Sequence, residues 1–170
     1  TSNRLSISAG LTTFNRKMPP RLVIEMAEEN LEKSKSVDCK KDGTFKNSIT
    51  LFDRTMGWNE YFEMEMLGET LADEINSDNL AKEFLYHLIE LDERNPYLKE
   101  NFVRGKEIVV PDPHVYYYLN RNYSKGTEDK SQRDKKINEL MEKIISKKNY
   151  KHIRVAANIA AYITKDLRGD

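Results

Sequence analysis

Residues 58–91 constrain the fold of this chain most, because their pattern predicts two amphipathic helices joined by a short turn at 76–78. In each half, large apolar residues recur three or four positions apart, which places their side chains on one helix face. This hairpin holds the only tryptophan and much of the large apolar surface, so we expect the core to form against it. The two predicted stripes are Trp58, Phe62, Met66, Leu67, Leu71 and Ile75, then Leu80, Phe84, Leu85, Leu88, Ile89 and Leu91.

Three further segments have a helical pattern. The first begins at Pro19 and Pro20, since proline suits the first turn of a helix. The second follows Ser131, which we interpret as an N-cap, and the third covers residues 152–166. Their predicted apolar faces are Leu22, Val23, Met26, Ala27 and Leu31; Ile137, Leu140, Met141, Ile144 and Ile145; and Ile153, Ala156, Ile159, Ala160 and Ile163.

The residue patterns of two further segments indicate β structure. Residues 45–52 alternate in part between apolar and polar side chains, which favours a short edge strand. Residues 107–119 contain valines and the consecutive Tyr116, Tyr117 and Tyr118, interrupted by Pro111 and Pro113. Because proline cannot donate to a strand ladder, we expect two short strands, a hairpin or an extended arm here. We therefore expect a mainly α fold: a single domain of about five or six helices around the central hairpin, with a small β element.

The domain organisation follows from length and polarity. A chain of 170 residues has the size of one domain. Residues 1–18 are polar and lack a sustained period, so we expect a flexible N-terminal arm ahead of a single helical domain at 19–170. Four apolar residues could anchor this arm: Leu5, Ile7, Leu11 and Phe14.

The cysteine content and the apolar runs indicate a compartment. The single Cys39 excludes an intrachain disulfide and a zinc site built from cysteines. It fits a reducing environment, so we expect a cytoplasmic protein. No apolar run approaches the roughly 20 residues that span a bilayer, so we expect no membrane partner.

The charges are balanced overall but segregated along the chain. The formal net charge is zero. Asp and Glu predominate in residues 51–101, whereas Lys and Arg predominate from residue 131 onward. These regions could complement each other within the fold or between copies, bind separate partners, or form ordinary solvated surfaces.

The basic residues of the last two predicted helices form a candidate nucleic-acid site. Lys151 and Arg154 lie near the start of the final helix, where the macrodipole disfavours cations and favours anions. A bound phosphate would offset that electrostatic cost, and Tyr150 could stack on a base. The candidate nucleic-acid-binding residues are Lys143, Lys147, Lys148, Lys151 and Arg154.

Two carboxylate motifs indicate an alternative function. Pro111 and Asp112, followed by Glu128, Asp129 and Lys130, resemble the PD-(D/E)xK nuclease signature. That resemblance implies two carboxylates, here Asp112 and Glu128, that hold a divalent metal beside the attacked phosphate.

Three segments bear on the same alternative. Residues 53–58, 99–101 and 115–119 resemble pieces of the endonuclease domain of influenza-type polymerase acidic subunits, in the same order. That family's metal-binding histidine and catalytic lysine have no counterpart at matching positions, and Arg121 is the nearest basic residue after the tyrosines. The resemblance therefore transfers no site residue and implies an inactive relative.

His87 offers a further metal hypothesis, because Glu83 and Glu90 share its helix face. The other interpretation is a half-buried histidine beside solvated glutamates. Taking all patterns together, we expect no resident cofactor, no metal and no catalytic residue. The expected function is a non-enzymatic interaction protein within a larger assembly, with a protein partner or self-association, and nucleic-acid contact through the basic helices. The alternative is a metal-dependent nuclease or its inactive relative.

Overall fold

The computed structural model describes residues 6–36, 47–94, 101–103, 106–108, 113–123, 130–145 and 151–165. Contacts divide the chain into two compact units, Thr1–Glu63 and Met64–Asp170. The division into an arm at 1–18 and one domain at 19–170 stays a prediction, and the expected anchor Leu5 lies outside the described residues.

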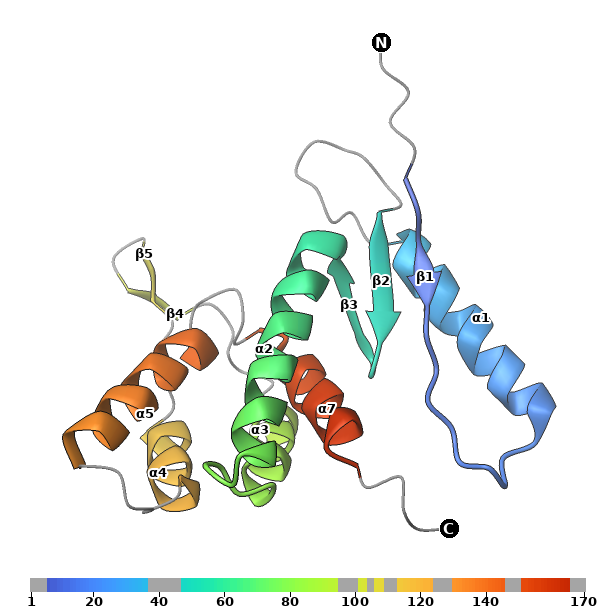
Figure 1. The fold of residues 1–170 in the computed structure, drawn as a ribbon. Coiled ribbons are helices and arrows are strands. Elements are labelled where there is room, and N and C mark those ends of the chain that lie inside the picture. Colours follow the sequence, from blue (N-terminus) through green and yellow to red (C-terminus); the bar gives the residue numbers. More distant parts are fainter. Residues whose placement is uncertain are drawn as a thin grey trace. The chain divides into compact units, whose positions relative to one another are not determined.

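The first unit combines a three-stranded sheet with one helix (Figure 1). The strands are β1 (Ala9–Gly10), β2 (Ser48–Leu51) and β3 (Arg54–Gly57), in the order β1-β2-β3. β1 runs parallel to β2, and β2 pairs with β3 in antiparallel fashion. The helix α1 (Pro20–Ser36) contacts all three strands and begins at the predicted proline pair.

The strand predicted at 45–52 is shorter than expected and is not at an edge. β2 ends at Leu51 and is the middle strand of the sheet, with all four residues buried. Phe52 and Asp53 then form a two-residue connection with φ values of 49° and 61°. Two successive positive φ values are typical of the turns that join tight hairpins. The chain therefore reverses into β3, a strand that was not predicted.

Polar groups on α1 hold the N-terminal segment in place. The buried Asn30 donates from Nδ2 to the Leu11 carbonyl oxygen at 2.9 Å and to Thr12 Oγ1 at 3.0 Å. At Gly10 the strand passes so close to α1 that a Cβ atom would overlap the backbone nitrogen of Leu31. Only glycine permits this approach. The segment is thus fixed through its backbone.

The expected apolar anchors of the arm are wrong. Ile7, Leu11 and Phe14 are 69%, 50% and 58% exposed. Their backbone makes the contacts instead: β1 pairs with β2, and Trp58 Nε1 donates to the Ile7 carbonyl oxygen at 2.8 Å. Leu22, predicted for the buried face of α1, is also exposed.

The helix α2 (Trp58–Asn76) follows β3 directly. The Gly57 amide donates to Glu60 Oε2 at 2.9 Å, which satisfies a donor at the start of the helix. Its predicted apolar stripe is partly wrong, because Phe62 and Met66 are 52% and 67% exposed. The buried residues of this helix are Met64, Leu67, Gly68, Leu71 and Ala72.

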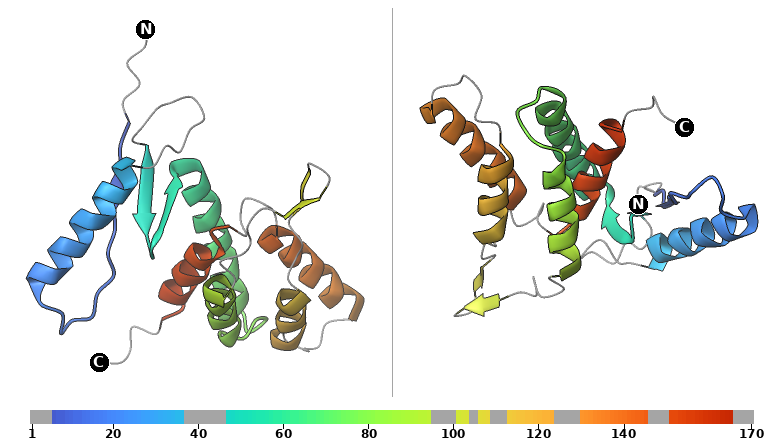
Figure 2. Two further views of the ribbon diagram at one scale, coloured as in Figure 1. Left: turned by 180° about the vertical axis from the view of Figure 1, so that it is seen from behind. Right: turned by 90° about the horizontal axis from the view of Figure 1, so that it is seen from below.

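The second unit is built from the rest of α2 and the remaining helices (Figures 1 and 2). The elements are α3 (Glu83–Arg94), α4 (Pro113–Asn122), α5 (Lys130–Ile145) and α7 (Ile153–Ile163), with a two-stranded ribbon of β4 (Asn101–Val103) and β5 (Lys106–Ile108). With α1 and α2, the described residues contain six helices. The predicted central hairpin and the mainly α fold with a small β element are confirmed.

The tyrosine segment is helical, which corrects the predicted strand at 115–119. α4 begins at Pro113, a position where a missing N–H removes no helical hydrogen bond. Val115 and Leu119 are fully buried four positions apart, whereas Tyr116 and Tyr117 are exposed. Of the described residues in the predicted β region, those that form a strand belong to the short ribbon strand β5.

The core of the second unit forms where the hairpin was expected. Phe84, Leu85 and Leu88 of α3 are 0% exposed. α3 contacts both α4 and α7, so it lies between them. α5 buries Ile137, Leu140, Met141 and Ile144, as predicted. Its start differs by two residues: an N-cap at Ser131 predicts a helix from Gln132, whereas the helix begins at Lys130 and contains Ser131.

The two helices of the hairpin are joined by a turn with its own hydrogen bonds. Asp78 has a φ of 57°, and the Asn79 and Leu80 amides both donate to the Glu74 carbonyl oxygen. Tyr123, at the end of α4, donates from its hydroxyl to Glu74 Oε2 at 2.9 Å. This bond ties the end of α2 to the end of α4.

Candidate functional site

Three aromatic side chains on α3 and α4, each at least partly exposed, pack against one another in the second unit. The rings of His87 and Tyr118 are stacked, with centroids 3.9 Å apart and planes 13° apart. Tyr117 meets Tyr118 edge to face, with centroids 5.5 Å apart and planes 68° apart. We call His87, Tyr117 and Tyr118 the aromatic surface.

The packing of α3 on α4 positions this surface. Leu88 follows His87, and Leu119 follows Tyr118; both leucines are fully buried. The buried leucines lie where α3 packs on α4. The residues before them, His87 and Tyr118, meet at the edge of this helix contact. Tyr117 is 56% exposed, while Tyr118 and His87 are of intermediate exposure. The surface therefore has a supported inner pair and an outer ring that reaches solvent.

Carboxylates flank the aromatic surface on the α3 side. Glu90 Oε2 lies 3.9 Å from His87 Nδ1. Glu83 is exposed and lies one helical turn before His87, on the same face. On α4 the exposed Arg121 lies one turn after Tyr117. Among the described side chains, Glu83, Glu90 and Arg121 thus place charges of both signs near the aromatic surface.

The alternative in which His87, Glu83 and Glu90 hold a metal ion is not supported. Within the part of the chain that the structure describes, no three His, Cys, Asp or Glu side chains are placed to share a metal ion. The His87 ring is stacked on Tyr118 instead. The imidazole is therefore one ring of the aromatic surface, with the Glu90 carboxylate beside it.

The basic candidate residues are placed in part. Lys143 is exposed in the last turn of α5, and Lys151 is exposed just before α7. Arg154, in the first turn of α7, is of intermediate exposure. Lys147 and Lys148 lie outside the described residues. Nucleic-acid binding by this group stays a prediction.

The nuclease alternative is also untested. Asp112 and Glu128 both lie outside the described residues. Of the segments that resemble the polymerase endonuclease, residues 53–58 run from the turn before β3 into α2, and residues 115–119 are helical.

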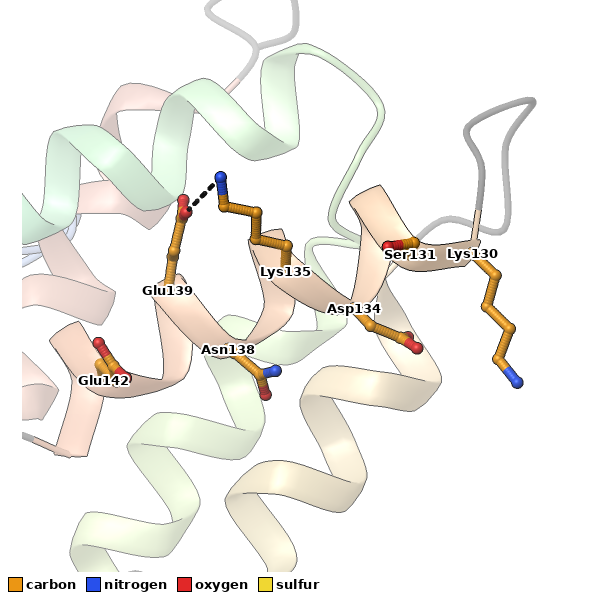
Figure 3. Close-up of a pocket in the computed structure, with 7 residues that line it drawn as sticks. All are labelled: Lys130, Ser131, Asp134, Lys135, Asn138, Glu139 and Glu142. Carbon is orange, nitrogen blue, oxygen red and sulfur yellow. Dashed lines mark ion pairs between the residues drawn. The ribbon is translucent and has the colours of Figure 1, made fainter.

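A shallow hollow runs along α5 (Figure 3). All of its lining residues belong to that one helix, and none of them is buried. An ion pair of 3.8 Å joins Lys135 Nζ to Glu139 Oε1. A single solvated helix face offers no second wall to enclose a ligand. The lining residues are Lys130, Ser131, Asp134, Lys135, Asn138, Glu139 and Glu142.

The sequence drew attention to the tyrosines of the aromatic surface but not to their contact with His87. The tyrosine run itself stands out in the sequence, but it was assigned to a β segment. No signal pairs Tyr118 with His87, because the two residues are far apart in the chain and meet only through helix packing.

Among the described residues, no helix has the length and apolar character to cross a membrane. Comparison with protein-family models, with curated proteins and with solved structures finds no match to this chain.

Proposed function

We propose that this chain is a non-enzymatic protein–protein interaction domain that acts within a larger assembly. The observation that carries the proposal is the aromatic surface on α3 and α4. Its rings are held by one another and by the helices beneath them. Tyrosine is enriched at protein interfaces, where its ring packs against apolar groups and its hydroxyl accepts water or polar partners.

The geometry favours binding because the tyrosine side chains lose little rotamer freedom when a partner binds. A flexible side chain loses rotamer freedom at an interface, which opposes association. Here Tyr118 is already stacked and Tyr117 already rests against it. Part of the ordering cost is therefore met in the free protein.

The first test is Tyr117→Ala in the full chain. Alanine favours the helix, so the variant removes the outer ring without weakening α4. A central interface tyrosine contributes about 2 kcal/mol, which corresponds to a roughly 30-fold weaker Kd. We expect quantitative affinity purification to show a matching loss of specific co-purifying proteins, and light scattering to show loss of any self-association.

Tyr162→Ala provides the matched control, because Tyr162 is 53% exposed on another helix, α7. The control should retain the partners that Tyr117→Ala loses. Identical partners and identical oligomeric state for wild type and Tyr117→Ala would refute the proposal.

A second candidate function is nucleic-acid contact, and the exposure of Lys143 and Lys151 favours it. We expect the double variant Lys143→Glu with Lys151→Glu to weaken binding to a single-stranded oligonucleotide, measured by fluorescence anisotropy over a salt series. Losing two phosphate contacts should lower the slope of log K against log salt by about 1.4. The control is Lys33→Glu with Lys35→Glu on α1, which changes the net charge equally. Equal losses in both pairs would mean non-specific attraction only.

A further inference from the structure

We infer that the aromatic surface takes a cationic side chain, an arginine or lysine, presented by a basic segment of a protein partner. This inference rests on the proposed function and names the chemistry of its partner. It is carried by the combination of open ring surface with carboxylates one helical turn away on either side of His87.

The ring surface supplies the first attraction. An aromatic face carries partial negative charge and attracts a guanidinium or ammonium group placed over it. Tyr117 is 56% exposed, so part of its ring is open to such a group. Tyr118 cannot serve equally, because His87 covers it at 3.9 Å.

The flanking charges supply the second attraction. Glu90 lies 3.9 Å from the His87 ring, and its side chain is 46% exposed. Glu83 is exposed one turn before His87. These carboxylates would attract a cation bound at the aromatic surface, whereas the guanidinium of Arg121 on α4 would repel it.

The same charges disfavour a nucleic acid here. A base could stack on Tyr117, because stacking platforms accept any base. Its phosphates, however, would be repelled by the carboxylates of Glu83 and Glu90, although Arg121 on α4 would attract them. Electrostatic complementarity therefore favours a basic protein segment over an oligonucleotide.

The probe is a short peptide that alternates arginine and leucine, with a matched peptide in which citrulline replaces arginine. Citrulline keeps the planar side-chain shape and removes the charge. Both are titrated into the ¹⁵N-labelled full chain at an ionic strength of about 0.15 M, which screens long-range attraction. We expect the arginine peptide to shift the signals of residues 83–90 and 114–121, and the citrulline peptide to leave them unchanged.

Variants then assign the contacts. An exposed cation–π contact corresponds to about a threefold change in Kd, so Tyr117→Leu should weaken the arginine peptide by that factor. Glu83→Gln with Glu90→Gln should weaken it similarly. The controls are Tyr162→Leu on α7, and Glu69→Gln with Asp73→Asn on α2, which removes the same charge at exposed positions. Far-UV circular dichroism verifies that each variant is folded.

Each outcome decides between the proposals. Absence of binding, equal binding of both peptides, or equal effects of the site and control variants would overturn the cation inference. Shifts of the same signals by an oligonucleotide but not by the arginine peptide would also overturn it, in favour of a nucleic-acid partner. The proposed function survives these results if Tyr117→Ala still loses its co-purifying proteins, and it falls only if that variant retains them.

Discussion

Replacing Phe84 with alanine is expected to lower the free energy of unfolding by about 3–5 kcal/mol. The side chain is 0% exposed and is among the largest fully buried ones in the described residues. Its helix, α3, contacts both α4 and α7, so a cavity at Phe84 would lie at the centre of the second unit. Removing a buried ring loses its transfer free energy and leaves contacts that the neighbours cannot restore.

Urea denaturation followed by far-UV circular dichroism measures this loss. The matched control is Tyr86→Ala, because Tyr86 lies on the same helix but is 59% exposed. Its effect should stay within about 0.5 kcal/mol. If Phe84→Ala does not fold, Phe84→Leu should still cost about 1 kcal/mol. A loss below about 1 kcal/mol for the alanine variant would show that Phe84 is not in the core.

The position of Phe84 could be predicted because the local pattern and the packing agree. Leu80, Phe84 and Leu88 recur every four residues, and all three are buried. α5 was predicted for the same reason, from Ile137 to Ile144. Where one helix face carries most of the apolar residues, that face is the one that packs in the core.

The buried face of α2 could not be predicted as well, because the helix has apolar residues on more than one side. A stripe through Phe62 and Met66 fits helical spacing as well as one through Met64, Leu67 and Leu71. The structure buries the second stripe and exposes the first. The choice depends on the neighbouring helix α7, which the sequence pattern of α2 does not contain.

Two local errors have identifiable causes. Valine and tyrosine favour strands, so residues 115–119 suggested one, although Val115 and Leu119 also have helical spacing. The hairpin turn at Phe52 and Asp53 was missed because neither residue is the glycine or asparagine that usually adopts positive φ.

Less of the candidate site was predictable than of the fold. Tyr117 and Tyr118 were assigned to a β segment, and their partner His87 was considered as a metal ligand or as a half-buried histidine, not as a stacking partner. The stacking depends on the relative position of α3 and α4, which buried leucines set. An interface of this kind can be recognised only once the packing of the helices is known, whereas a metal or phosphate motif can be recognised in the sequence alone.

Replacing Gly68 with leucine is expected to destabilise the second unit by about 3 kcal/mol, the upper part of the usual range for overpacking. At Gly68 the helix α2 lies against α7. A Cβ atom there would be 2.8 Å from Ile159 Cγ2 and 2.9 Å from the Ala156 carbonyl oxygen. The Ile159 side chain could move, but the carbonyl belongs to the helix backbone, so the two helices would have to separate. α7 permits this close approach because Ala156 and Ala160 are small and fully buried.

Gly68→Ala sharpens the test, because helix propensity and packing then act in opposite directions. Alanine favours a helix interior over glycine by about 1 kcal/mol, so a gain in stability would be expected if α7 were not in contact. We expect instead a net loss of about 1 kcal/mol, since the added methyl group meets the Ala156 carbonyl oxygen. Glu69→Leu, at the next and exposed position, is the control for a larger side chain on α2 and should change stability by less than about 0.5 kcal/mol. Urea denaturation of the three variants compares these losses, and a Gly68→Ala variant more stable than wild type would contradict the α2–α7 contact.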